Sequence, residues 1–171
     1  MRTIRKYTLQ KARWQYAFDV IAVSSVVIAV IYTLLQWTQL PEAVPIHFKA
    51  IGHTESYGSR YALFLIPTIA AALYATFHNF EKRPHLYKYF AIDDEIAFKL
   101  YKARSLVMHM IKNLTMLLMS YAMVSLVDSA LIGTSSLNMW VFGTLLGIVL
   151  LPAVLGFIYL VRLQLNASQE Q

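Results

Sequence analysis

The chain has 171 residues, of which 58% are hydrophobic and only 14% are charged. A water-soluble domain of this size does not carry so large an apolar excess, so the composition indicates a membrane protein. The absence of cysteine excludes disulfides, thiol nucleophiles and cysteine metal sites. The net charge of +6 comes from basic residues that flank apolar runs. We therefore expect anionic lipid headgroups, and not nucleic acid, as their partners.

Four apolar stretches are each long enough to cross a bilayer, which takes roughly 20 residues in a helix. They are expected at about residues 17–37, 61–80, 106–127 and 139–161. The first stretch is longer than the apolar part of a signal peptide and lacks a cleavage site, so we interpret it as a retained anchor. The predicted fold is all-α: a single polytopic domain over residues 1–171, built as an up-down-up-down bundle of four transmembrane helices.

Basic residues predict the orientation, because loops rich in Lys and Arg stay in the cytoplasm. Five lie in the N-terminal arm and six lie in the basic segment 81–105. The loop 38–60 carries only Lys49 and the boundary residue Arg60. Both termini are therefore expected inside the cell, and the loop 38–60 outside it.

The outer loop is rich in residues that restrict or shape the backbone. Pro41 and Pro45 favour extended geometry, Gly52 and Gly58 permit positive φ, and the run 46–48 is typical of a short strand. An ordered loop is expected.

A family resemblance is found in the same loop. Leu-Pro-x-x-x-Pro-Ile-His-Phe, followed by Gly-x-x-Glu-x-x-Gly-Ser-Arg, resembles the signature of a bacterial membrane domain of unknown function found in SdpI-like immunity proteins. The segment 83–89 resembles the cytoplasmic segment of small members of that family. The resemblance implies a non-enzymatic immunity or sensing role in the bacterial plasma membrane, directed at an extracellular membrane-active peptide or ligand. The motif residues that would serve it are Pro41, Pro45, His47, Phe48, Gly52, Glu55, Gly58 and Arg60.

His47, His53 and Glu55 are also metal-ligand types, but their spacing matches no zinc pattern and a fourth ligand is missing. The favoured interpretation is that His47 bonds to loop backbone, while Glu55 pairs with Arg60 or caps the second helix. We expect no metal and no cofactor.

The basic segment is expected to end in a helix that enters the membrane without a break. Asp93 or Asp94 can cap it, and Glu95 and Lys99 are spaced to form an ion pair. A polar stripe then continues along this helix and is expected to contact lipid headgroups or a cytoplasmic partner; it comprises Lys99, Lys102, His109 and Lys112.

Few ionisable residues lie within the predicted spans. Lys112 is expected to extend its long side chain back to the interface, and His78 is placed to meet His109 in a hydrogen-bonded packing contact. The acids Asp19 and Asp128 lie near opposite membrane boundaries, which disfavours an ion-coupled transporter.

Motifs for catalysis are lacking: the sequence has no GxSxG, HExxH or glycine-rich phosphate loop, so an enzyme is not expected. Small residues such as Ser25, Ser120, Gly143 and Gly147 are expected to allow close helix contact, within the chain or in a homo-oligomer. The alternatives are a small metal-dependent membrane enzyme or carrier, and a structural subunit of a membrane complex.

Overall fold

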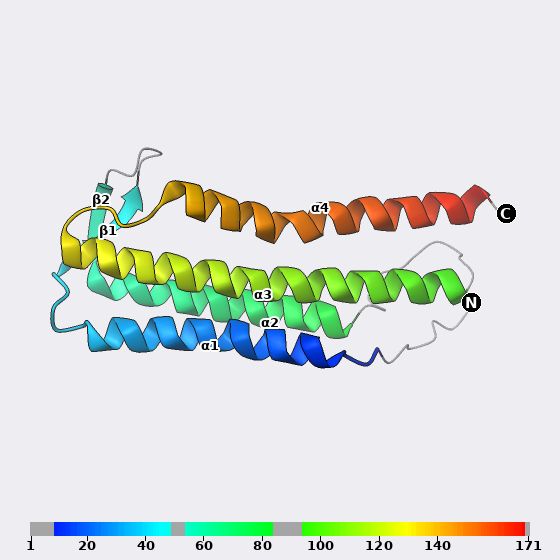
Figure 1. Ribbon diagram of the computed structural model, residues 1–171, viewed down its shortest axis with the longest axis horizontal. Helices are drawn as coiled ribbons and strands as arrows, with labels where there is room; N and C mark the ends of the chain where they lie inside the picture. Colours follow the sequence, from blue (N-terminus) through cyan, green and yellow to red (C-terminus); the bar gives the residue numbers. More distant parts are fainter. Residues whose placement is uncertain (1–8, 49–53, 84–93, 170–171) are drawn as a thin grey trace.

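The computed structural model describes residues 9–48, 54–83 and 94–169, with the side chains of all of these except 47, 48, 54, 55, 94 and 167–169. Among these residues, four helices are long and apolar enough to cross a membrane. They are α1 (Arg13–Leu35), α2 (Leu65–Lys82), α3 (Asp94–Ile132) and α4 (Met139–Gln169). Successive helices run in opposite directions along one axis (Figure 1). The all-α, up-down-up-down prediction is confirmed.

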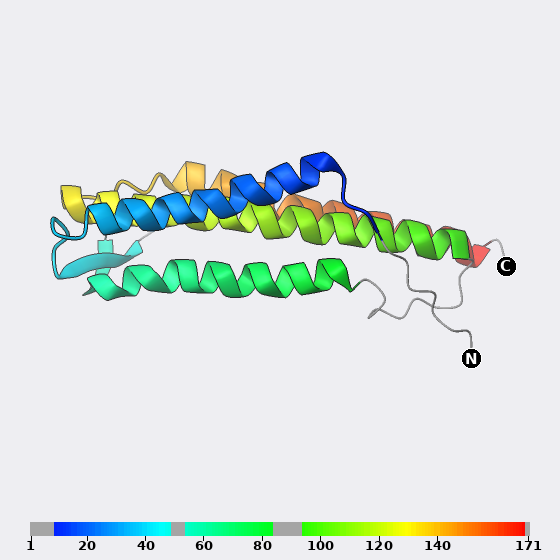
Figure 2. The same cartoon turned by 90° about the horizontal axis from the view of Figure 1, so that it is seen from below.

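Helix α3 is the centre of the bundle and packs against α1, α2 and α4 (Figures 1 and 2). Its 39 residues correspond to about 58 Å, nearly twice the roughly 30 Å of a hydrocarbon core. The predicted span 106–127 is therefore only the middle of a longer helix. The expectation of an unbroken helix entering from the basic segment is confirmed.

Small side chains bring α1 and α3 together as expected. Ser120 Oγ donates a hydrogen bond to Ser25 Oγ at 3.1 Å. One turn away, Ala22 and Met116 pack with Ala70 of α2 in a buried apolar cluster. These contacts hold three helices together through close packing, as membrane helices require.

The close approach of α4 to α3 involves a different glycine from the predicted pair. A Cβ atom built at Gly156 would overlap the side chain of Val107, whereas one at Gly143 or Gly147 meets no described atom within 4 Å. In the most apolar stretch of α4, only 6% of the residues are buried within the chain. The Gly143 and Gly147 pair therefore makes no close contact within the described chain.

The outer loop folds into a hairpin. Strand β1 (Ala43–Phe48) pairs antiparallel with β2 (Thr54–Ser59), and a 3₁₀ turn, η1 (Arg60–Phe64), then leads into α2. Residues 46–48 are extended as predicted, but the pairing with β2 was not predicted. The register shifts around His47, which marks an irregularity in β1.

An apolar cluster fastens the hairpin to one end of the bundle. Leu40, Val44 and Leu63 pack against Val127 and Ala130 of α3. This contact holds the outer loop against the end of the bundle.

The predicted orientation can be tested with single cysteines, because the chain contains none of its own. Tyr57 in β2 and Lys99 near the start of α3 are both exposed. Strand β2 and the start of α3 lie at opposite ends of the molecule (Figure 1). We expect Tyr57→Cys to react with a membrane-impermeant maleimide in intact cells, and Lys99→Cys to react only after the cells are opened. Labelling of both variants in intact cells would contradict the orientation.

Candidate functional site

The hairpin at the outer end is shaped by close packing between its strands. Val44 and Pro45 are buried, and the side chain of Ile46 lies across Gly58. A Cβ at Gly58 would come within 2.9 Å of Ile46 Cδ1. Gly58 does not have the positive φ that glycine permits. A side chain at this position would require the exposed side chain of Ile46 to move.

Arg60 holds the base of the hairpin. Its backbone N–H donates to the carbonyl of Glu42 at 3.0 Å. Its guanidinium Nη1 reaches the carbonyls of Trp37 and Leu40 at 3.5 and 3.4 Å, and its Cζ lies 4.9 Å from the centre of the Trp37 ring. These contacts fix the entry and exit of the hairpin relative to each other.

Several motif residues cannot be placed at the level of side chains. Gly52 and His53 lie outside the described residues, as do the side chains of His47, Phe48 and Glu55. The predicted contacts of His47 and Glu55 therefore stay predictions. Pro41 is exposed at the start of the hairpin.

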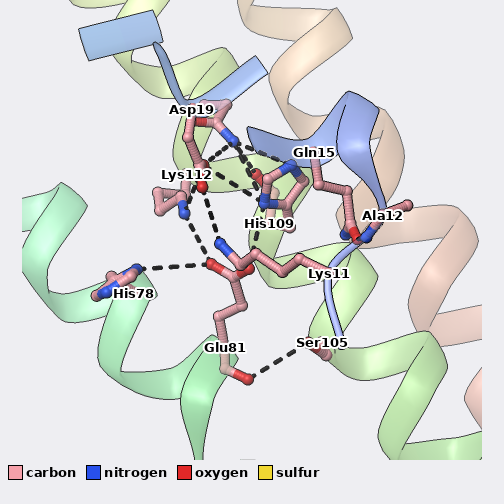
Figure 3. Close-up of polar contacts among 10 residues, drawn as sticks. Lys11, Ala12, Gln15, Asp19, His78, Glu81, Ser105, His109 and Lys112 are labelled. Atoms are coloured by element: carbon pink, nitrogen blue, oxygen red, sulfur yellow. Dashed lines mark hydrogen bonds and ion pairs between the residues drawn. The ribbon is translucent and has the colours of Figure 1, made fainter. Parts of the chain in front are cut away.

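The second candidate site is a cluster of charged and polar side chains at the opposite end of the bundle (Figure 3). We call it the buried charge cluster. It comprises Lys11, which precedes α1, Asp19 of α1, Glu81 of α2, and His109, Lys112 and Asn113 of α3.

Two ammonium groups and two carboxylates alternate in the buried charge cluster. Lys112 Nζ lies 2.8 Å from Asp19 Oδ1 and 2.7 Å from Glu81 Oε2. Lys11 Nζ bridges the same two carboxylates through their other oxygens, at 2.8 and 2.7 Å. The four charges sum to zero, which is the condition under which burying them is tolerable.

Neutral and aromatic groups complete the surroundings. His109 Nδ1 lies 3.2 Å from Glu81 Oε1 and 3.5 Å from Asp19 Oδ1. Asn113 Nδ2 donates to Asp19 Oδ1 at 2.8 Å. The Lys112 ammonium also lies 4.8 Å from the centre of the Tyr74 ring.

The prediction that Lys112 extends back to the interface was wrong. Its side chain is fully buried, as is that of His109. The Lys112 ammonium does not need water to solvate its charge, because Asp19 and Glu81 neutralise it where it lies. His78 Nδ1 lies 3.8 Å from Glu81 Oε2, so the two histidines share Glu81 as a neighbour.

Three charged members of the cluster were not predicted as site residues. Glu81 lies in the last turn of α2, one residue beyond the predicted span, and Lys11 was counted only for orientation. Asp19 was considered only for its position near a membrane boundary. A signal was present. Tyr74, His78 and Glu81 recur at helical spacing, which puts polar groups on the face that meets α3.

The remaining basic residues of the polar stripe stay at the surface. Lys99 pairs with Glu95 at 2.7 Å, as predicted, and both side chains are exposed. Lys102 is exposed one turn further along α3. The stripe thus divides into a solvent-facing half, with Lys99 and Lys102, and a buried half, with His109 and Lys112.

The contacts within the buried charge cluster suit a role in joining helices better than a role in binding a metal ion. No group of three or more His, Asp or Glu side chains in the described parts of the chain is arranged to hold a metal ion. Both carboxylates of the cluster are already occupied by ammonium groups. What the cluster does is join the N-terminal arm, α1, α2 and α3 at one point.

The family match lies in the hairpin and in the adjoining parts of α1 and α2. Residues 25–71 match a domain of unknown function, DUF1648. This match covers the outer part of α1, the hairpin and the start of α2, and it contains the whole loop motif. An uncharacterized protein of Archaeoglobus fulgidus is 46% identical over 39 residues, which are 23% of this chain and 21% of that protein. No solved structure matches the chain.

Proposed function

We propose that this protein is a non-enzymatic receptor-like component of the bacterial plasma membrane. In this role it senses an extracellular membrane-active peptide or related ligand, or protects the envelope from it. The observation that carries the proposal is the hairpin packed on one end of the membrane bundle, which together with the turn η1 presents exposed apolar and aromatic side chains. Ile46, Tyr57 and Tyr61 are 39%, 62% and 66% exposed.

The hairpin has the properties of a binding surface on a scaffold. Its base is held by Arg60 and its inner face by Val44 against α3. Binding therefore needs little ordering of the backbone, which otherwise opposes association. Exposed tyrosines give large contact area at low conformational cost, and they suit the apolar face of an amphipathic peptide.

Helix α3 connects the hairpin with the buried charge cluster, so binding at the hairpin would affect the cluster at the other end of the helix. The same helix contacts the hairpin through Val127 and Ala130 and carries His109 and Lys112 of the buried charge cluster. A shift of α3 along its axis would alter both ends together. This continuity supports a sensing role as well as a protective one.

The proposal is tested by removing exposed hairpin side chains. Tyr57→Ala should reduce by about thirtyfold the concentration of a synthetic amphipathic membrane-active peptide that expressing cells survive, because aromatic hot-spot contacts contribute about 2 kcal/mol. Tyr16→Ala is the matched control, because Tyr16 is a tyrosine that is 58% exposed and lies near the start of α1, away from the hairpin. His47→Ala and Glu55→Ala test the two motif side chains. Unchanged survival in all three hairpin variants, with normal amounts of protein in the membrane, would count against the proposal.

A further inference from the structure

A cavity of about 690 Å³ lies beside the buried charge cluster, between the segment preceding α1 and the early turns of α3. Its polar lining includes Gln10, Lys11, Lys102 and Ser105. Its apolar lining includes Trp14 and Leu106. The size is that of a small-molecule or headgroup site.

Lys11 is shared between the cluster and the cavity. An ammonium group has three protons to donate, and the contacts with Asp19 and Glu81 use two of them. Burial disfavours the charged form of Lys11, but the hydrogen bonds to Asp19 and Glu81 outweigh this and raise its pKa. Lys11 therefore stays protonated, with one donor that Asp19 and Glu81 do not use.

Lys102 supplies positive charge that the cluster does not neutralise. It lines the cavity and is exposed, and no ion pair joins it to another described residue. Lys99, one turn away, differs in both respects because it pairs with Glu95 and does not line the cavity. Among the described residues that line it, the cavity thus has one unpaired cation, Lys102, and a second ammonium group, Lys11, with a donor that its two carboxylate partners do not use.

The apolar side of the cavity lies where lipid chains would reach it. Trp14, half exposed at the start of α1, is the kind of residue that sits at the headgroup level of a bilayer. Leu106 on α3 is exposed as well. A site with cations at its polar side and apolar side chains at its membrane side is complementary to an amphiphile with an anionic head.

We propose that this cavity binds the phosphate headgroup of an anionic phospholipid of the cytoplasmic leaflet. Lys102 and the remaining proton of Lys11 contact the phosphate oxygens, and an acyl chain lies along Trp14 and Leu106. Because Lys11 also bridges Asp19 and Glu81, the bound lipid is linked directly to the buried charge cluster. His109 and Lys112, expected from sequence to face headgroups, are excluded from this site by their burial.

Native mass spectrometry of the full chain in detergent, titrated with lipid, measures the binding directly. We expect phosphatidylglycerol to bind more tightly than phosphatidylcholine with the same acyl chains. Lys102→Ala should weaken phosphatidylglycerol binding by about fivefold, the effect of one basic residue near anionic lipid, and Lys102→Glu should weaken it further. Lys99→Ala and Lys99→Glu are the matched controls and should stay within about twofold of the unmodified chain.

Three outcomes would overturn the proposal. One is equal weakening by the Lys99 and Lys102 substitutions, which would indicate general surface charge. Another is unchanged binding in both Lys102 variants. The third is binding of soluble glycerol phosphate as tight as that of phosphatidylglycerol, which would assign the cavity to a free phosphate compound. Because Lys102 is exposed, its variants should fold normally, and an unchanged unfolding temperature checks this.

Discussion

Replacing Lys112 by methionine should lower the free energy of unfolding by about 3–5 kcal/mol, the usual effect of removing one partner from a buried ion pair. Lys112 is fully buried and contacts both Asp19 and Glu81. Its loss leaves two carboxylates with only Lys11 to neutralise them, in surroundings where an unpaired charge is poorly solvated. Unfolding of the purified protein by SDS in mixed micelles measures the change.

Lys99→Met is the matched control, because it makes the same chemical change on the same helix at an exposed ion pair. It should change stability by no more than about 0.5 kcal/mol. Adding Glu81→Gln to Lys112→Met restores the charge balance and should recover part of the lost stability. Equal stability of the Lys112→Met and Lys99→Met proteins would show that the cluster does not hold the helices together.

Gly156→Ala should lower the free energy of unfolding by about 1–3 kcal/mol, the range typical of overpacking a tight contact. The added Cβ would overlap the Val107 side chain, and a valine cannot move aside by rotating a long flexible chain. The overlap has to be relieved by moving α4 away from α3. The same unfolding assay measures this loss.

Gly143→Ala is the control on the same helix, because its Cβ would meet no described atom within 4 Å. Alanine is the better helix former, so this variant should lose no stability as a monomer. Val107→Ala in the Gly156→Ala background should restore part of the loss by removing the overlapping methyl groups. A larger loss at Gly143 than at Gly156 would instead indicate that the outward face of α4 packs against another chain.

The buried charge cluster has a structural consequence beyond stability. Pairing buried charges is often close to neutral in free energy compared with apolar packing, so the cluster is weak evidence for a stable bundle. It is better understood as setting the relative positions of helices. Asp19, Glu81 and Lys112 come from three different helices, and the observed alignment of these helices brings their charges together.

The hairpin shows where prediction from sequence reached its limit. Alternation and proline content predicted an ordered, extended segment, and β1 confirms it. The partner strand β2 has the sequence Thr-Glu-Ser-Tyr-Gly-Ser, which carries no run of β-branched or apolar residues. Its pairing depends on the anchoring of β1 against α3, which is not a local property.

The sequence by itself determined the number and alternation of the membrane-crossing helices, because an apolar segment of about 20 residues can satisfy its backbone in lipid only as a helix. It also determined the Glu95 and Lys99 pair, which depends only on spacing within one helix. Tertiary structure decided that the side chain of Lys112 is buried and does not extend to water. Whether a lysine near a membrane boundary extends to water or stays buried depends on whether other helices bring carboxylates to it. Here α1 and α2 do so, with residues 93 and 31 positions away in the chain.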